Sequence, residues 1–187
     1  MSLSPIKYEI LATILLLDKP EKAINIAKET GKGFPSIMMH IIGLTRMGYT
    51  ASPQKGLYAL TEKGKKALGI PQVNRENAQT LLAGRSDDSS FKFYAGLGKP
   101  LDLQARGLQD FYVTIVKLNP DSIDFHINRG DFEAWFAELG DGELAKKTAL
   151  LKEKKMSAEE LRSRLAELVK NRCTALANMT GHAISTE

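Results

Sequence analysis

The first seventy residues alternate between apolar stretches with helical spacing and short polar breaks. Apolar side chains recur three and four positions apart in three segments, which predicts three amphipathic helices that each bury one face. These side chains are Ile6, Ile10, Leu11, Ile14, Leu15 and Leu17 in the first segment, Ala23, Ile24 and Ala27 in the second, and Ile37, Ile41 and Leu44 in the third. Residues 18–20 end the first helix, a glycine-containing turn follows the second, and Pro35 suits the first turn of the third.

A hairpin is predicted directly after the third helix. Gly48 closes that helix, and YTASPQKGLYALT, residues 49–61, has the pattern of two short strands around a polar turn. The turn residues are Ser52, Pro53, Gln54, Lys55 and Gly56. Thr61 stands where its hydroxyl can cap a last helix that runs to Leu68. Residues 1–70 are thus expected to form one domain.

Residues 71–90 combine Pro, Gly, Asn and Ser around a short helical segment at 75–83, which predicts a linker. Beyond it, residues 91–187 are expected to form an α-helical domain. Phe91 and Phe93 alternate with polar neighbours like a short strand. A helix follows, which Pro120 is expected to end. Its apolar positions are Leu108, Phe111, Tyr112, Ile115 and Val116.

The last sixty residues predict three more helices. Asp131 is interpreted as the cap of a helix that turns Phe132, Trp135 and Phe136 inward. Two longer helices are expected at about 142–155 and 158–178, and a capping box of Ser157 with Glu160 starts the second of them. Its apolar stripe suits either the core of its own domain, which we favour, or a dimer seam. The stripe consists of Leu161, Leu165, Leu168, Val169 and Leu176.

Charge is distributed unevenly along the chain. Residues 1–70 hold ten Lys and Arg against five Asp and Glu, whereas residues 71–187 hold sixteen against seventeen. A basic segment of this kind points to a polyanion such as nucleic acid. The longest apolar run, residues 10–17, is too short to span a bilayer, and the N-terminus lacks the pattern of a signal peptide, so we expect a cytoplasmic protein.

The basic segment also carries a resemblance. LTRMGYTASPQKGLYALTEKGKKAL, residues 44–68, resembles the end of the recognition helix, the wing and the following helix of winged-helix transcription regulators, particularly the one-domain regulators of bacteria and archaea. The matching residues are Leu44, Gly48, Tyr49 and Leu60 to Gly64. The resemblance covers about residues 5–69. It implies a mainly α fold with a small β-hairpin wing, a winged helix-turn-helix followed by the α-helical second domain, and a DNA-binding ancestry.

The second domain resembles a helical domain of uncharacterised archaeal proteins. GDFEAWFAELGDGELAKK, residues 130–147, carries this resemblance together with Ser122 and His126. It extends over about residues 91–147. The resemblance implies no activity, so the C-terminal domain is assigned to assembly or partner binding.

The third helix has little with which to read DNA bases. If Ile37, Ile41 and Leu44 face inward, a rotation of 100° per residue turns a mostly apolar set of residues outward. That set is Ser36, Met38, Met39, Ile42, Gly43 and Arg46. Leaving Met38, Met39 and Ile42 in water forgoes roughly 1.5–3 kcal/mol each. Something is therefore expected to cover them: the C-terminal half of the chain, a second copy or another protein.

Two functions follow from these residues. The first is a homodimeric transcriptional regulator that binds double-stranded DNA mainly through phosphates, with Ser36 and Arg46 nearest to base edges. The DNA-binding residues would be Lys32, Ser36, Arg46, Lys55, Lys63, Lys65 and Lys66. The alternative is a winged helix that binds protein instead of DNA through Met38, Met39 and Ile42.

No enzyme chemistry is predicted. His126, Asp131 and Glu133 lie close together in the sequence, but their spacing matches no metal-ligand pattern, and a structural role is favoured for them. A nucleophile motif and a phosphate-binding loop are both missing from the sequence. Cys173 is the single cysteine, which excludes an intramolecular disulfide. Neither a metal nor a cofactor is expected.

Overall fold

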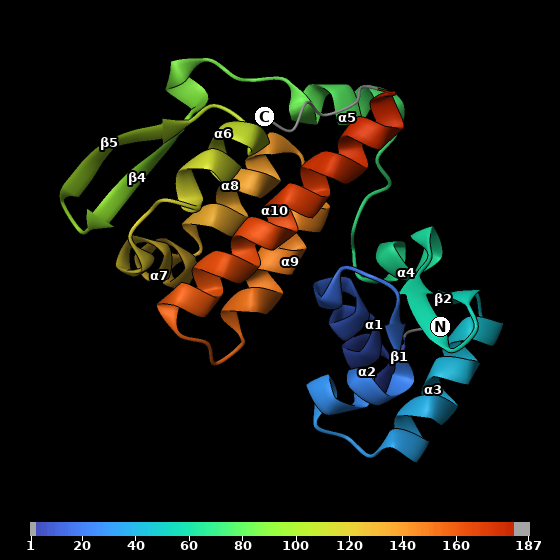
Figure 1. The fold of residues 1–187 in the computed structure, drawn as a ribbon. Helices are drawn as coiled ribbons and strands as arrows, with labels where there is room; N and C mark the ends of the chain where they lie inside the picture. Colours follow the sequence, from blue (N-terminus) through green and yellow to red (C-terminus); the bar gives the residue numbers. More distant parts are fainter. Residues whose placement is uncertain (1–2, 182–187) are drawn as a thin grey trace. The chain divides into compact units, whose positions relative to one another are not determined.

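The computed structural model describes residues 3–181, which contain ten α-helices and two small antiparallel sheets. The fold is therefore mainly α, as the sequence predicts. The chain divides into two compact units, residues 1–72 and 73–187 (Figure 1). Within residues 3–181, every helix is too short or too polar to cross a lipid bilayer.

The first unit contains four helices and three strands. They are α1 (Pro5–Leu17), β1 (Glu21–Lys22), α2 (Ala23–Thr30), α3 (Phe34–Arg46), β2 (Thr50–Gln54), β3 (Leu57–Leu60) and α4 (Glu62–Ala67). Asp18 ends α1 in the left-handed conformation, and Pro35 lies in the first turn of α3. Ile37, Ile41 and Leu44 are fully buried, which confirms the predicted inward face of α3.

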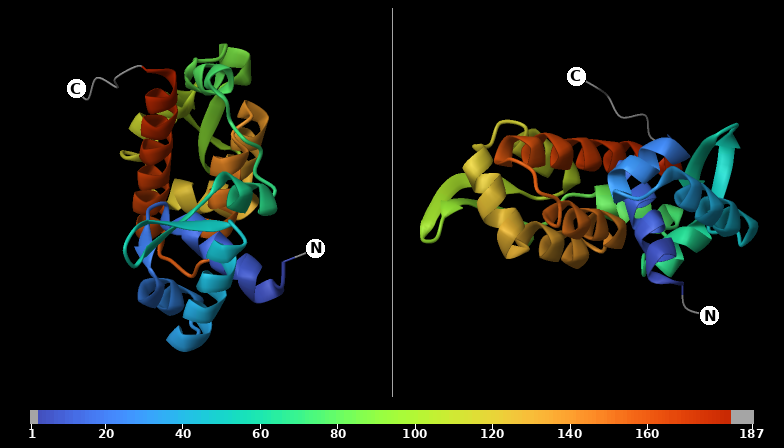
Figure 2. Two further views of the ribbon diagram at one scale, coloured as in Figure 1. Left: turned by 90° about the vertical axis from the view of Figure 1, so that its right-hand side faces the viewer. Right: turned by 90° about the horizontal axis from the view of Figure 1, so that it is seen from below.

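The sheet of the first unit has the order β1-β3-β2, and all its pairs are antiparallel. β1 was not predicted from the sequence, because two residues are too few to carry an alternating pattern. The predicted turn at 52–56 is shorter in the structure, since β2 continues to Gln54 through an irregularity after Ala51. Only Lys55 and Gly56 separate the two strands, and Gly56 takes the positive φ (80°) that this tight turn requires. Figure 2 shows the β2–β3 hairpin projecting from the helices of its unit.

The inward face of α2 differs from the prediction. Ile26 is fully buried beside Ala23 and Ala27, whereas Ile24 is 43% exposed. Ile24 and Ile26 are 200° apart on a helix, so they cannot both face the core. The spacing of Ala23, Ile24 and Ala27 allowed either face, and the packing of α2 against α1 and α3 selects the face with Ile26.

The second unit contains six helices and a hairpin. They are α5 (Arg75–Leu82), a 3₁₀ turn (Asp87–Ser89), β4 (Phe91–Gly96), β5 (Lys99–Ala105), α6 (Leu108–Ile115), α7 (Pro120–Arg129), α8 (Asp131–Leu139), α9 (Gly142–Lys152) and α10 (Ala158–Thr180). α10 packs against α5, α6, α7 and α9 (Figure 1). The leucine and valine stripe of α10 is buried inside its own unit, as the favoured interpretation predicted.

Three features of the second unit differ from the predicted pattern. The segment expected as a linker is mostly part of this unit, because α5 buries Ala78 and Leu81 and packs on α10. The expected short strand is one arm of a two-stranded hairpin, β4–β5. Pro120 begins α7, capped by Asn119, while α6 already ends at Ile115.

Aromatic rings fill the centre of the second unit. Phe111 lies edge-to-face with Phe132 and Phe136, with ring centroids 5.1 and 5.0 Å apart, and it stacks on Trp135 at 5.4 Å. The predicted inward positions of α8 are thus confirmed. Each such ring pair contributes about 0.5–1.5 kcal/mol beyond its buried area.

A buried cluster of charges joins α10 to α9. The guanidinium of Arg172 donates from Nε to Asp141 Oδ2 (2.7 Å) and from Nη1 to Glu143 Oε2 (3.1 Å). Lys147 Nζ contacts Glu143 Oε1 at 2.8 Å. Asp141 also caps α9 by accepting the Leu144 N–H. The four charged side chains are at most 9% exposed, so the two cations and two anions compensate each other away from water.

Candidate nucleic-acid interface

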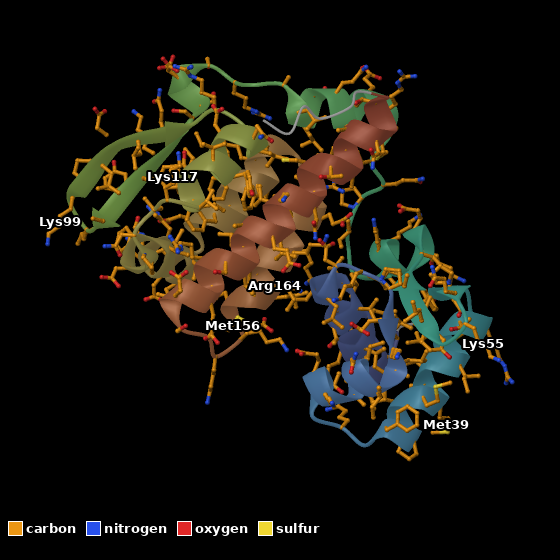
Figure 3. The ribbon with its side chains drawn as sticks, viewed as in Figure 1. Met39, Lys55, Lys99, Lys117, Met156 and Arg164 are labelled. Atoms are coloured by element: carbon orange, nitrogen blue, oxygen red, sulfur yellow. The ribbon has the colours of Figure 1, made fainter. Side chains whose placement is uncertain are left out.

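The outward face of α3 is largely apolar, as the sequence predicts. Met39 is 64% exposed and Ile42 39% exposed, and Figure 3 shows Met39 directed away from the first unit. Met38 is half-buried, because the Tyr58 hydroxyl of β3 donates to its sulfur at 3.9 Å. Phe34, which sequence reasoning missed, is 43% exposed at the start of α3. The exposed apolar surface therefore consists of Phe34, Met39 and Ile42, with Met38 at its edge.

Three of the proposed phosphate-binding cations are free to meet a ligand. Arg46 at the end of α3, Lys55 at the tip of the β2–β3 hairpin and Lys66 on α4 are exposed. None of them forms an ion pair with a residue between 3 and 181. Lys55 points into solvent beyond the hairpin (Figure 3). We call these three side chains the free cations. Arg46 is the last residue of α3, and Lys55 and Lys66 lie on the hairpin and the helix that follow α3.

The other three cations already have partners in the first unit. Lys32 lies 3.1 Å from Glu9, and Lys65 lies 3.5 Å from Glu62. Lys63 donates to the main-chain oxygen of Met47 at 2.7 Å, and its ammonium lies 4.7 Å from the centre of the Tyr49 ring. Exposed ion pairs of this kind are weak, but they leave less positive charge for a phosphate. Lys63 instead ties α4 to the end of α3.

A tight joint holds α4 against the segment that follows α3. Thr61 caps α4 by accepting the Gly64 N–H (3.1 Å), as predicted, and its hydroxyl donates to the Gly48 oxygen at 2.7 Å. Its own N–H donates to the Tyr49 oxygen at 3.1 Å. Gly64 lies so close that a Cβ there would be 2.2 Å from the same Tyr49 oxygen. The joint fixes where Lys66 lies relative to Arg46.

Ser36 lies on the exposed surface at the start of α3, and Gly43 lies on its later half. Ser36 has one hydroxyl, which can both donate and accept, while Gly43 offers no side chain. Arg46 is the one predicted base reader that can bond a guanine with two nitrogens. The polar groups on the outward face of α3 thus lie at its two ends, while His40, in the middle of the helix, is half-buried.

His126 and Asp131, for which the sequence favours a structural role, are in contact in the second unit. The imidazole Nδ1 lies 2.8 Å from Asp131 Oδ2, and Nε2 accepts the Tyr94 N–H of β4 at 2.9 Å. Because Nε2 accepts, Nδ1 carries the proton and donates to Asp131. Burial lowers the pKa of His126 and keeps the ring neutral, against the opposing effect of Asp131. Both nitrogens are occupied, so His126 acts as a structural link between α7 and β4.

Asp131 does not cap α8 as predicted. It is the first residue of that helix, and Gly130, with φ at 78°, both ends α7 and precedes α8. Its carboxylate is directed to His126 and to Arg129 Nε (3.1 Å). Within residues 3–181, no group of three or more His, Cys, Asp or Glu is placed to hold a metal ion.

A search of protein-family models, curated proteins and solved structures finds no match to this chain.

Proposed function

We propose that the protein is a winged-helix transcriptional regulator whose first unit binds double-stranded DNA mainly through phosphates. In this proposal α3 is the recognition helix, β2–β3 is the wing, and the free cations Arg46, Lys55 and Lys66 meet the DNA backbone. The observation that carries the proposal is that these three cations are exposed and have no acidic partner among residues 3–181, on the elements that a winged helix turns toward DNA.

The same geometry implies weak sequence selectivity. Phosphate contacts position a protein on DNA, but base-edge contacts select a sequence. On α3, Arg46 and Ser36 are the polar groups on the outward face, and the middle of the helix presents Met39 and Ile42. The affinity for different duplexes should therefore vary little, apart from contacts between these apolar side chains and thymine methyl groups.

Binding to random-sequence duplex DNA should weaken steeply with salt. Three phosphate contacts give a slope of about −2.7 in log K against log salt, or a loss of roughly 40-fold between 50 and 200 mM. The measurement is fluorescence anisotropy of a labelled duplex with the full chain across a salt series. A binding constant that stays constant across this range, or no binding at low salt, would contradict the proposal.

The variants R46Q, K55Q and K66Q identify the contacts. Each should weaken binding to all duplexes alike and reduce the salt slope by about one. K99Q is the matched control, because Lys99 is an exposed lysine of the second unit (Figure 3). Equal effects of K99Q and K55Q would show that DNA contact is not confined to the first unit.

The second candidate function is a protein-interaction module, favoured by the exposed apolar surface of Phe34, Met39 and Ile42. The double variant M39E/I42E should abolish self-assembly or partner binding through this face, because it places two charges where apolar contact is needed. I24E is the matched control, since Ile24 is 43% exposed, close to Ile42 at 39%, but lies on α2. Analytical ultracentrifugation of the three proteins decides the matter: unchanged assembly of M39E/I42E refutes the interaction function.

A further inference from the structure

A groove of about 600 Å³ runs along β4 in the second unit, on the side of α7 and α8. Its volume lies within the range of about 300–1,000 Å³ that is usual for small-molecule sites. Buried or half-buried aromatic side chains contribute to its lining, namely Phe91, Tyr94, Phe125 and Trp135. The groove also contains five charged side chains: Arg129, paired with Asp131 where α8 begins, Asp88 and Glu138 toward the other end of α8, and Lys92 on β4.

A cationic group lies where α8 begins. Arg129 Nε donates to Asp131 at 3.1 Å, and its guanidinium carbon lies 5.1 Å from the centre of the Phe125 ring. Asp131 is itself fixed by the proton of His126. Among residues 3–181, neither terminal nitrogen of Arg129 has a hydrogen-bond partner. The guanidinium is thus held in place and presents the two-nitrogen fork that binds a carboxylate.

Two carboxylates lie toward the other end of α8. Glu138 is seven residues beyond Asp131, or about 10 Å along the helix axis. Asp88 lines the same groove from the 3₁₀ turn, which is joined to α8 by the hydrogen bond from Trp135 Nε1 to the Ser89 oxygen. Both carboxylates are exposed, and neither forms an ion pair with a described residue. Ala134 and Trp135 lie between the two charged ends on the same face of α8.

We propose that this groove binds a short peptide with both ends free. The peptide carboxylate is held by Arg129, its ammonium group by Asp88 and Glu138, and a central side chain lies against Trp135. An extended tripeptide spans about 10 Å, which matches the axial distance along α8 from Asp131, the ion-pair partner of Arg129, to Glu138. This site is independent of the proposed DNA function, because every residue that forms it belongs to the second unit.

Trp135 is the only tryptophan, so its fluorescence reports occupancy of the groove in the full chain. A tripeptide library with free ends should shift this emission at millimolar or lower concentration. The same library with amidated C-termini, or with acetylated N-termini, should bind at least about tenfold more weakly, since each change removes one charge-assisted contact. No shift with the free library, or an equal shift with either blocked library, overturns the proposal.

Variants assign the two ends separately. R129Q should remove the preference for a free carboxylate, and D88N/E138Q should remove the preference for a free amine, with roughly tenfold weaker binding in each case. K117Q is the control, because Lys117 is exposed outside the groove (Figure 3). If R129Q also disturbs Asp131, the variant D88N/E138Q still tests the proposal, because Asp88 and Glu138 are exposed. If decapeptides with the same C-terminal residues bind as tightly as the tripeptides, Asp88 and Glu138 do not hold the ammonium group of the peptide.

Discussion

Replacing Arg172 with alanine is expected to lower the free energy of unfolding of the second unit by roughly 3–5 kcal/mol. The change removes the guanidinium that bonds both Asp141 and Glu143, which are at most 9% exposed. Glu143 keeps Lys147, but Asp141 loses its ion-pair partner while it remains buried. A buried carboxylate without its cation either stays charged at high cost or takes up a proton.

Two signals follow this loss in the full chain. Trp135 lies in the second unit, so its fluorescence during denaturant unfolding reports on that unit alone. Cys173, next to Arg172 on α10, is 3% exposed, and burial raises the pKa of its thiol to about 11. Alkylation of Cys173 at neutral pH should therefore be slow in the wild-type protein and faster in R172A, because a thiolate forms mainly when the unit opens.

R164A is the matched control on the same helix. Arg164 pairs with Glu167 at the surface, and such pairs contribute about 1 kcal/mol or less. If R172A and R164A shift the unfolding curve by similar amounts, the buried cluster does not stabilise the unit as its geometry implies.

Local rules in the sequence predicted some elements well because the signals come from neighbouring residues. The cap at Thr61 and the capping box of Ser157 with Glu160 are present in the structure. The inward face of α3 follows from the spacing of three large apolar residues, which places Ile37, Ile41 and Leu44 on one side of the helix. In each case the physical cause lies within two turns of helix.

Elements that depend on distant partners were missed or misread. Asp131 has the composition of a cap, but His126 and Arg129 compete for its carboxylate in the fold. His126 in turn bonds Tyr94, thirty-two positions earlier, and the Ser122 hydroxyl donates to the Tyr94 oxygen at 2.5 Å. These two side chains of α7 satisfy main-chain groups of β4, a role that no spacing rule reveals.

The candidate site was only partly visible in the sequence for the same reason. Counting cations singles out six lysines and arginines, but it cannot show that Glu9, Glu62 and the Met47 carbonyl already engage three of them. The apolar side chains of α3 were recognised from helical rotation, whereas the partial cover of Met38 by Tyr58 needs the hairpin in place. The groove on α8 combines residues up to fifty positions apart and has no local pattern.

Replacing Gly64 with alanine is expected to destabilise the first unit by roughly 1–3 kcal/mol, whereas the same change at Gly43 should stabilise it by up to about 1 kcal/mol. A Cβ at Gly64 would meet the Tyr49 carbonyl oxygen at 2.2 Å and its carbon at 3.2 Å. Both atoms are main chain, and the same oxygen accepts bonds from Thr61, so the contact cannot be relieved by turning a side chain. A Cβ at Gly43 meets nothing within 4 Å.

The pair of variants also tests whether the joint serves the DNA-binding face. G64A must shift α4 away from Tyr49, and with it Lys66, so its affinity for duplex DNA should fall even where the unit remains folded. G43A leaves α4 in place, so a change in its DNA affinity would come from the outward face of α3 and not from the joint. Unfolding is followed by circular dichroism and by hydrogen exchange of residues 3–72, with Trp135 fluorescence unchanged in both variants because it reports on the second unit. Wild-type stability of G64A would show that the close approach of Gly64 to Tyr49 relaxes at little cost, and wild-type DNA affinity would show that α4 contributes no phosphate contact.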